Sequence, residues 1–278
     1  MKNNLVGCLI ITHNPPLAIL NKTINKLLEY KDIINIFIID NSDETIQLKK
    51  SIQNLIKLNL INFEHINNTS VLYSFNYGIN KIKREINPEF IMFLEDDNML
   101  ITDLTEIIKL YYKMHLVARD LVIFNDRSFP LEKHTLIYSK QLIGIGTYFA
   151  RSALFYNIPL REEFIMDQGD FDFQIKVRKD SGSIFITSWK VIERPAPGRE
   201  QLPLWRDYLA IRNATVLFLV ERNGIIFCFK QFRGLSGGFI INMKKYGVVK
   251  FLKIALEAFY DGITKNFDNN KVWEFRKL

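Results

Sequence analysis

Phe90-Ile91-Met92-Phe93-Leu94-Glu95-Asp96-Asp97-Asn98 is an apolar run that stops abruptly on three consecutive acids. Such a run predicts a buried strand, and ligands of an open α/β sheet bind beyond the carboxyl ends of its strands. Adjacent carboxylates repel one another, so they favour a bound cation, and a few hard oxygen ligands suit Mg²⁺ or Mn²⁺ held together with a phosphate. The alternative is a solvated acidic turn before a helix, because Thr102, Asp103 and Glu106 are typical of a helix start.

The segments before this stretch alternate between strand and helix patterns. We expect strands over Leu5 to Thr12, Ile34 to Ile39 and Leu60 to Phe63, with amphipathic helices between them. This alternation predicts an α/β fold, a mostly parallel sheet flanked by helices. The strands end on polar clusters, which are Thr12-His13-Asn14, Asp40-Asn41 and Glu95-Asp96-Asp97. Parallel strands bring these ends to one edge, as a nucleotide site needs.

The second half of the chain has a less regular pattern. A strand is expected over Ile143 to Phe149, which contains two glycines, and an acidic cluster, Asp167-Gln168-Gly169-Asp170-Phe171-Asp172, follows it before a helix over Phe173 to Arg178. From Phe239 to Ile263, apolar residues at helical spacing alternate with lysines. That segment predicts either a helix packed on the rest of the protein or a helix that lies on an anionic membrane surface.

Length and composition bound the function classes. With 278 residues, 48% of them hydrophobic, the chain is long enough for one large α/β domain or for a domain plus a helical appendage, and it is not a disordered protein. A net charge of +7 favours anionic partners: nucleotide phosphates, lipid surfaces or nucleic acid. Nucleic acid is the weakest of these, because the basic residues are scattered and form no known motif.

Compartment signals point to the cytoplasm. Cys8 and Cys228 lie far apart in apolar runs, which predicts reduced core thiols. Leu5 to Ile11 is followed by Thr-His-Asn-Pro-Pro, so we interpret it as a first strand and not as a signal peptide. No uninterrupted apolar stretch approaches the roughly 18 residues that a bilayer span needs. We expect a cytoplasmic protein, with the inner face of the cell membrane as a further place of action.

The ordered set of these motifs resembles the family 2 inverting glycosyltransferases with the GT-A fold. It is most similar to the bacterial branch that adds sugars such as rhamnose or galactofuranose to surface polysaccharides. The resemblance runs from Leu5 to Asn213 and rests on the following segments: the first strand ending Thr12-His13-Asn14-Pro15, the second strand ending Ile38-Ile39-Asp40-Asn41-Ser42, the pattern from Asn68-Thr69-Ser70 to Asn76-Tyr77-Gly78, the metal-binding strand end Leu94-Glu95-Asp96-Asp97, and the catalytic Asp170-Phe171-Asp172. It implies a GT-A domain over 1–213, with a nucleotide-binding half (1–115) and an acceptor half (116–213), and a helical extension over 214–278.

The resemblance also implies roles for individual residues. Asp170 would be the catalytic base that takes the proton of an acceptor hydroxyl. Asp97 would bind the metal, Mn²⁺ or Mg²⁺, with Glu95 and Glu193 as further candidate ligands. The donor nucleotide would be contacted by Thr12, Asn14, Asp40, Asn68 and Asp96, and the acceptor would be bound or supported by Asp167, Asp172, Trp189 and Arg212. Each has a structural alternative: a helix amino terminus for the Asp170 cluster, a helix cap for Asp40, a core position for Trp189 and a solvated helix position for Arg212.

The chain departs from the family pattern at several positions. Glu95 replaces the first aspartate of the metal motif, Ser70 replaces a glycine, and Gly169 stands where many relatives have a glutamate. Where some relatives have a late histidine that holds the metal or diphosphate, this chain reads Val191-Ile192-Glu193-Arg194-Pro195. Glu193 is therefore either a replacement ligand or a surface residue.

The leading hypothesis is a metal-dependent inverting glycosyltransferase. It would move a sugar from a UDP- or dTDP-linked donor to a glycan or lipid-linked acceptor, with peripheral attachment to a membrane and no nucleic-acid partner. One alternative is a glycan- or nucleotide-binding protein with weakened catalysis, which the departures at Glu95 and Gly169 keep open. The other is a sugar nucleotidyltransferase, but that class carries a Gly-x-Gly-Thr-Arg loop where this chain has Thr12-His13-Asn14-Pro15.

Overall fold

The chain consists of two compact units. The computed structural model describes residues 5–67, 70–130, 133–194, 203–221, 239–268 and 271–272. Unit 1 comprises Met1–Leu160 and Phe173–Ala196, and unit 2 comprises Arg161–Asp172 and Pro197–Leu278. The helix α6 (Gly169–Lys179) begins in unit 2 and continues in unit 1. The predicted boundary between a GT-A domain over 1–213 and a helical extension over 214–278 stays a prediction.

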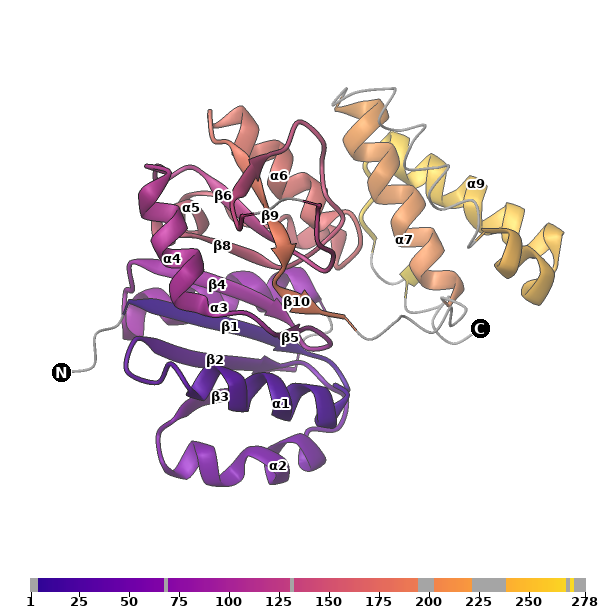
Figure 1. Ribbon diagram of the computed structural model, residues 1–278. Helices are drawn as coiled ribbons and strands as arrows, with labels where there is room; N and C mark the ends of the chain where they lie inside the picture. The colour runs from indigo at the N-terminus through magenta and orange to yellow at the C-terminus, as the bar shows by residue number, and fades with distance from the viewer. Residues whose placement is uncertain are drawn as a thin grey trace. The chain divides into compact units, whose positions relative to one another are not determined.

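Unit 1 is built on an eight-stranded sheet with the order β3-β2-β1-β4-β8-β6-β9-β7 (Figure 1). The first four strands in this order are mutually parallel, as are β6 and β9, whereas β8 and β7 run antiparallel to their neighbours. The prediction of an α/β fold with a mostly parallel sheet is confirmed. The strands are β1 (Val6–Thr12), β2 (Ile34–Asp40), β3 (Ile61–His65), β4 (Phe90–Glu95), β6 (Leu121–Asn125), β7 (Leu136–Tyr138), β8 (Tyr148–Arg151) and β9 (Ile184–Lys190).

Amphipathic helices connect the strands and cover the sheet. They are α1 (Leu17–Leu28), α2 (Ile46–Lys57), α3 (Val71–Glu85), α4 (Leu104–Lys113) and α5 (Ser152–Asn157). In α1, Leu20, Ile24 and Leu27 are fully buried at the predicted helical spacing. β1 is buried along its whole length, as expected for a strand covered on both faces, and it contains the reduced Cys8. Cys228 lies outside the described residues.

A two-stranded ribbon extends unit 1 beside the acidic strand end. β5 (Met99–Leu100) pairs antiparallel with β10 (Ile192–Glu193), so that Glu193 lies opposite Met99. The ribbon joins a segment directly after β4 to one that follows it by more than ninety residues. It therefore brings Arg194 to the end of the acidic strand.

Two expectations for the second half are wrong. The strand predicted over Ile143 to Phe149 begins only at Tyr148, and its two glycines lie in irregular backbone. The helix predicted from Phe173 begins at Gly169, and α5 and the short helix η1 (Glu162–Phe164) separate it from β8. Asp170 and Asp172 consequently lie in the first turn of α6, where carboxylates interact favourably with the helix dipole.

Unit 2 is a helical assembly with its own core. It contains α7 (Leu204–Ala214), which continues into a π-helix over Thr215–Val220, and α9 (Val248–Thr264), which packs on α7. Residues 239–246 are helical as well, and Gly247, with φ of 89°, breaks the continuous helix that the spacing from Phe239 to Ile263 suggests. None of the helices in the described ranges is long and apolar enough to cross a bilayer.

Candidate functional site

The polar ends of β1, β2 and β4 lie side by side at one edge of the sheet. Thr12 is paired with Asp40, and Ile11 with Glu95. The strand order places a topological switch point between β1 and β4, where α/β sheets bind their ligands. At this point the backbone N–H of His13 donates to a carboxylate oxygen of Asp96 at 3.2 Å. The loop after β1 and the turn after β4 are thus joined by a hydrogen bond.

Asp40 holds the ends of three strands together. Its side chain is fully buried and accepts hydrogen bonds from Thr12 Oγ1 at 2.8 Å, Ser42 Oγ at 2.5 Å and His65 Nδ1 at 3.0 Å. Burial alone would raise the pKa of Asp40, but these donors outweigh it, and the pKa lies below its usual value. The buried Asp40 therefore links the ends of these strands through hydrogen bonds, and its carboxylate is already bound by protein donors.

Glu95 forms an ion pair with Arg194, although the two residues lie 99 positions apart. Asn98, which is fully buried, donates to Glu95 Oε2 at 3.0 Å and to Thr147 Oγ1 at 2.9 Å, and it accepts from Arg194 Nε at 3.1 Å. A Cβ atom at Gly146 would lie 2.4 Å from Glu95 Oε1, so any other residue there would displace this carboxylate. Burial raises the pKa of Glu95, while Arg194 opposes that rise. This network fixes Glu95 toward Arg194.

Asp96 and Asp97 complete the acidic turn. Burial raises the pKa of Asp96 to about 7, with the charges of Asp97 and Glu95 adding to the rise and the His13 N–H opposing it. Asp97 Oδ1 is buried and has no hydrogen-bond partner among the described residues. Such an atom needs a donor or a cation, because an unsatisfied buried carboxylate oxygen is costly.

The residues at this turn fit a divalent cation that is shared with a ligand. Within the described ranges, no three His, Cys, Asp or Glu side chains are grouped to hold a metal by themselves. Mg²⁺ and Mn²⁺ in phosphate sites are usually held by only one or two carboxylates together with the phosphate oxygens and water. Asp97 suits that role, whereas Glu95 is already neutralised by Arg194.

Other predicted residues of unit 1 have positions that limit their roles. Glu193 is exposed and pairs with Lys190 at 3.1 Å. Trp189 is buried, donates to Thr102 Oγ1 at 3.0 Å and stacks on His134. Asn14 lies just beyond β1 with φ of 51°, and its N–H donates to Ser42 Oγ at 2.7 Å. Asn68 lies outside the described residues.

The acidic cluster of unit 2 contains three carboxylates, which differ in burial and in their partners. Asp172 is 1% exposed and forms an ion pair with Arg161 at 3.0 Å. Asp170 is only partly buried and accepts from the Phe171 N–H at 2.9 Å. Asp167 is held by Arg206, whose Nη2 lies 2.8 Å from its carboxylate. Of the two acids in the first turn of α6, Asp170 is the more exposed.

The acidic loop, residues 163–168, leads into α6 through an unusual backbone. Ile165, Asp167 and Gln168 all have positive φ, between 53° and 65°, a region that costs non-glycine residues on the order of 1 kcal/mol or more each. The Asn213 amide donates to the carbonyl oxygens of Phe164, Met166 and Asp167, each at 3.0 Å. These hydrogen bonds from α7 hold the strained loop.

Arg212 supports the same loop from inside unit 2. Its guanidinium is fully buried, donates to the Glu163 carbonyl oxygen at 3.0 Å and to Asn213 Oδ1 at 3.1 Å, and lies over the ring of Tyr208. Burial lowers the pKa of Arg212, a shift that the partial charge of Tyr208 opposes. The residue expected on a solvated helix face, or at the acceptor, is thus a buried support of the acidic loop.

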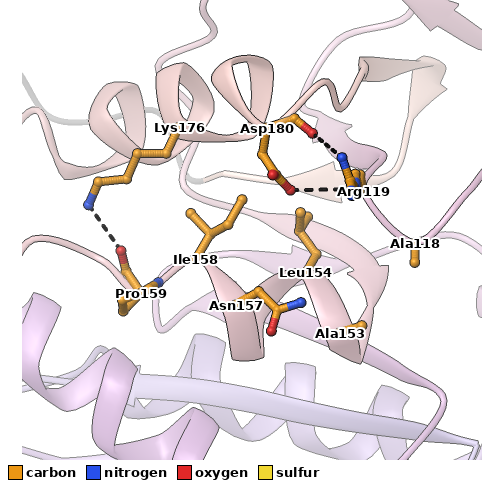
Figure 2. Close-up of a pocket in the computed structure, with 9 residues that line it drawn as sticks. All are labelled: Ala118, Arg119, Ala153, Leu154, Asn157, Ile158, Pro159, Lys176 and Asp180. Carbon is orange, nitrogen blue, oxygen red and sulfur yellow. Dashed lines mark hydrogen bonds and ion pairs between the residues drawn. The ribbon is translucent and has the colours of Figure 1, made fainter.

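A cavity of about 590 Å³ lies at the opposite edge of the sheet of unit 1 (Figure 2). Its lining includes Arg119, which lies just before the first residue of β6, and Asp180, which lies between α6 and β9. The apolar residues Leu154 and Ile158 line it as well. Figure 2 shows its polar rim, where Arg119 contacts Asp180 and Lys176 donates to the Pro159 carbonyl oxygen. Because ligands of such sheets bind at the carboxyl ends of the strands, we do not assign this cavity to the donor.

The fold is that of GT-A glycosyltransferases. The S. aureus TarS fragment 1–349 superposes with a TM-score of 0.59 at 17% identity, over 95% of this chain and 82% of that chain. The same fragment in complex with UDP gives 0.53 at 14% identity, over 94% and 90%. GalNAc-T7 with UDP, GalNAc and Mn²⁺ gives 0.55 at 11% identity, over 77% and 48%.

These likenesses establish the fold and no more, because the identities are low. Against the longer TarS crystal structure the chain spans 40% of that protein's length, with a TM-score of 0.54. No family model and no curated protein matches the sequence. The narrower resemblance to rhamnosyl- and galactofuranosyltransferases stays a prediction.

Proposed function

We propose that the protein is a metal-dependent inverting glycosyltransferase that uses a UDP- or dTDP-linked sugar and a glycan or lipid-linked acceptor, in surface polysaccharide synthesis. The observation that carries the proposal is the acidic turn of β4 beside the end of β1, at the switch point of a GT-A sheet. Solved neighbours with this fold were obtained with UDP, and one with UDP, GalNAc and Mn²⁺, which supports the donor class.

At the donor edge, Asp97 would hold Mn²⁺ or Mg²⁺ with its unsatisfied oxygen. Such an ion neutralises the negative charge that grows on a departing diphosphate. Arg194 places a second positive charge at the same turn, fixed by Glu95 and Asn98. Thr12 and Asp40 hold the ends of β1 and β2 in register beneath the nucleotide. Glu95 then orients Arg194 and is not itself a ligand.

At the acceptor, Asp170 would act as the base. The acceptor oxygen forms a bond to the anomeric carbon while the bond from that carbon to the diphosphate oxygen breaks, and the hydroxyl proton passes to the Asp170 carboxylate. Partial exposure makes Asp170 the better candidate than Asp172, which is buried against Arg161. The Arg206–Asp167 ion pair and Asn213 would hold the loop that presents Asp170.

The alternatives predict different behaviour. A sugar nucleotidyltransferase needs a glycine-rich loop after its first strand to bind a triphosphate, and β1 ends here on Thr12-His13-Asn14-Pro15. A binding protein with weakened catalysis would bind a nucleotide and leave the donor intact. The Glu95–Arg194 ion pair, in place of a freely available carboxylate, is the observation that favours this second candidate.

Two measurements test the proposal. The first is a thermal-shift screen of UDP, dTDP and GDP with and without Mn²⁺; a nucleotide at about 100 times its dissociation constant should stabilise the protein by roughly 2.7 kcal/mol. The second follows release of the nucleotide diphosphate from the matching sugar nucleotide. Binding without any release identifies the weakened binding protein, and the absence of both overturns the glycosyltransferase proposal.

A further inference from the structure

α9 is apolar on both of its faces. One face, with Phe251, Ile254 and Ala258, is buried in the core of unit 2. Yet the side chains that the helix exposes are also mostly apolar: Val248, Val249, Leu252, Leu256, Phe259, Tyr260 and Ile263, with Val249 83% and Leu256 69% exposed. A single exposed leucine is ordinary, but a row of exposed apolar residues on one helix is typical of a surface that binds a protein, a membrane or a ligand.

The exposed residues form one continuous stripe. Val249, Leu252, Leu256, Phe259 and Ile263 follow one another at alternating steps of three and four, which aligns side chains along a helix. Such a stripe suits either the same helix of a second copy, as in a coiled coil, or the boundary between lipid headgroups and acyl chains. Charge distinguishes these two occupants.

Cations border the stripe, and its acids are already paired. Lys253 is exposed next to Leu252, Lys250 lies one turn earlier, and Lys244 and Lys245 are exposed on the preceding helical segment. Both acidic residues of α9, Glu257 and Asp261, form ion pairs with Lys271. A second copy of α9 would bring the same lysines, and both of its carboxylates are already paired, whereas anionic headgroups complement the lysines.

We propose that the exposed face of α9 binds an anionic lipid surface, with the stripe from Val249 to Ile263 at the acyl boundary and the lysines at the lipid phosphates. This attachment would be peripheral, because only one face of the helix is available. It goes beyond the proposed function and does not depend on it, since the surface lies in a helix that contributes no residue to the donor edge of unit 1.

The test is co-sedimentation of the full chain with vesicles, without any nucleotide. We expect binding to vesicles of phosphatidylcholine mixed with phosphatidylglycerol and little binding to phosphatidylcholine alone. The double variant Leu252→Asn/Leu256→Asn should weaken binding at least tenfold, because each leucine no longer enters the lipid. Lys250→Gln and Lys253→Gln should each weaken it roughly fivefold.

The matched control is Ile46→Asn/Leu58→Asn, which removes two comparably exposed apolar residues of unit 1 and should bind like the wild type. Circular dichroism shows whether every variant is folded. Unchanged binding of the α9 double variant, or no vesicle binding by the wild type, overturns the proposal. A wild-type dimer that the double variant dissociates, without vesicle binding, assigns the stripe to a second copy. The vesicle result is independent of the activity result, so either proposal can fail alone.

Discussion

Asp97 is the residue on which the proposed donor site depends most directly. Its buried oxygen has no partner in the described part of the chain, so Asp97→Asn should keep the fold and lose most of the Mn²⁺-dependent gain in nucleotide affinity. Thermal shift with UDP, with and without Mn²⁺, measures this. Asp103→Asn, which changes only the exposed cap of α4, is the control and should keep the metal effect. An undiminished metal effect in Asp97→Asn means that the ion is held elsewhere.

Asp170 carries the prediction for the chemical step. Asp170→Asn keeps the shape of the side chain but cannot accept the proton, so turnover should fall by roughly 10²-fold or more while donor affinity stays within about twofold. Initial rates of sugar transfer and nucleotide binding measure the two effects separately. If turnover is nearly normal in Asp170→Asn and lost in Asp172→Asn, the base was assigned to the wrong carboxylate of a correct site.

Glu95 and Asp40 show what single residues reveal in a sequence and what they do not. The acidic strand end and its place at the edge of the sheet were predictable, because a short apolar run predicts a buried strand and the acids follow it directly. The partner of Glu95 was not, since Arg194 reaches it only through the β5–β10 ribbon. Nothing in the sequence around Asp40 indicates that its carboxylate accepts hydrogen bonds from Thr12, Ser42 and His65.

Asp207 gives a prediction for the pH dependence of stability. It is buried in unit 2, and burial raises its pKa to about 6, with Asp167 adding to the rise and Asn242 and Arg206 opposing it. In the unfolded chain the carboxyl ionises near 4. Between these values the folded state holds a proton that the unfolded state has released, so the contribution of Asp207 is fully present below about pH 4 and is lost as pH rises to about 6.

Asp207→Asn removes this titration. The variant should match the wild type near pH 4 and become more stable than it by up to about 3 kcal/mol above pH 6. Urea denaturation of both proteins at several pH values measures the difference in the free energy of unfolding. A difference that does not grow between pH 4 and pH 6 would show that Asp207 titrates normally.

At the scale of elements, the acidic loop and α7 act together. Asn213→Ala removes the donor to three carbonyl oxygens, so the positive-φ residues of the loop should relax toward ordinary backbone. We expect unfolding to become easier by about 1 to 3 kcal/mol, and turnover to fall at least tenfold with little change in donor affinity. Denaturation and steady-state kinetics measure the two effects.

Asn266→Ala is the matched control for this prediction. Asn266 also donates from a side-chain amide within unit 2, but its acceptor is Asp261 Oδ1, at 3.0 Å, and not a carbonyl oxygen of the acidic loop. Its loss should lower stability and leave turnover unchanged. Equal loss of turnover in both variants would mean that Asn213 acts only through the general stability of unit 2.

The elements were predictable where their period is regular and not where partners distant in sequence decide them. β1, β2, β4 and the helices between them follow from apolar spacing alone. The β5–β10 ribbon is only two residues long on each side, and such short pairings leave no pattern in a sequence. The early start of α6 at Gly169 follows from the loop that Asn213 and Arg212 hold. These contacts join residues more than forty positions apart, so local spacing does not predict them.

At the scale of the whole molecule, two edges of the sheet could hold the proposed donor. The carboxyl ends of β1, β2 and β4 provide a carboxylate that suits a metal ion and a cationic side chain. The cavity in Figure 2 is lined in part by apolar residues, and its Arg119 and Asp180 are paired with each other. We favour the carboxyl ends of the strands as the donor site, because binding of a nucleotide diphosphate requires that its negative charge be neutralised, which a cavity volume alone does not provide.

Hydrogen exchange measured along the chain distinguishes the two edges. UDP with Mn²⁺, at about 100 times its dissociation constant, should slow exchange most, by up to roughly 100-fold, in peptides covering residues 12–14, 40–42 and 95–98. Peptides covering residues 153–158 and 176–180, which line the cavity, should change no more than the remaining strands of unit 1. UDP without Mn²⁺ serves as the control and should protect the same segments less. Strong protection confined to 153–158 and 176–180 would move the donor to the cavity and remove Asp97 and Arg194 from its site.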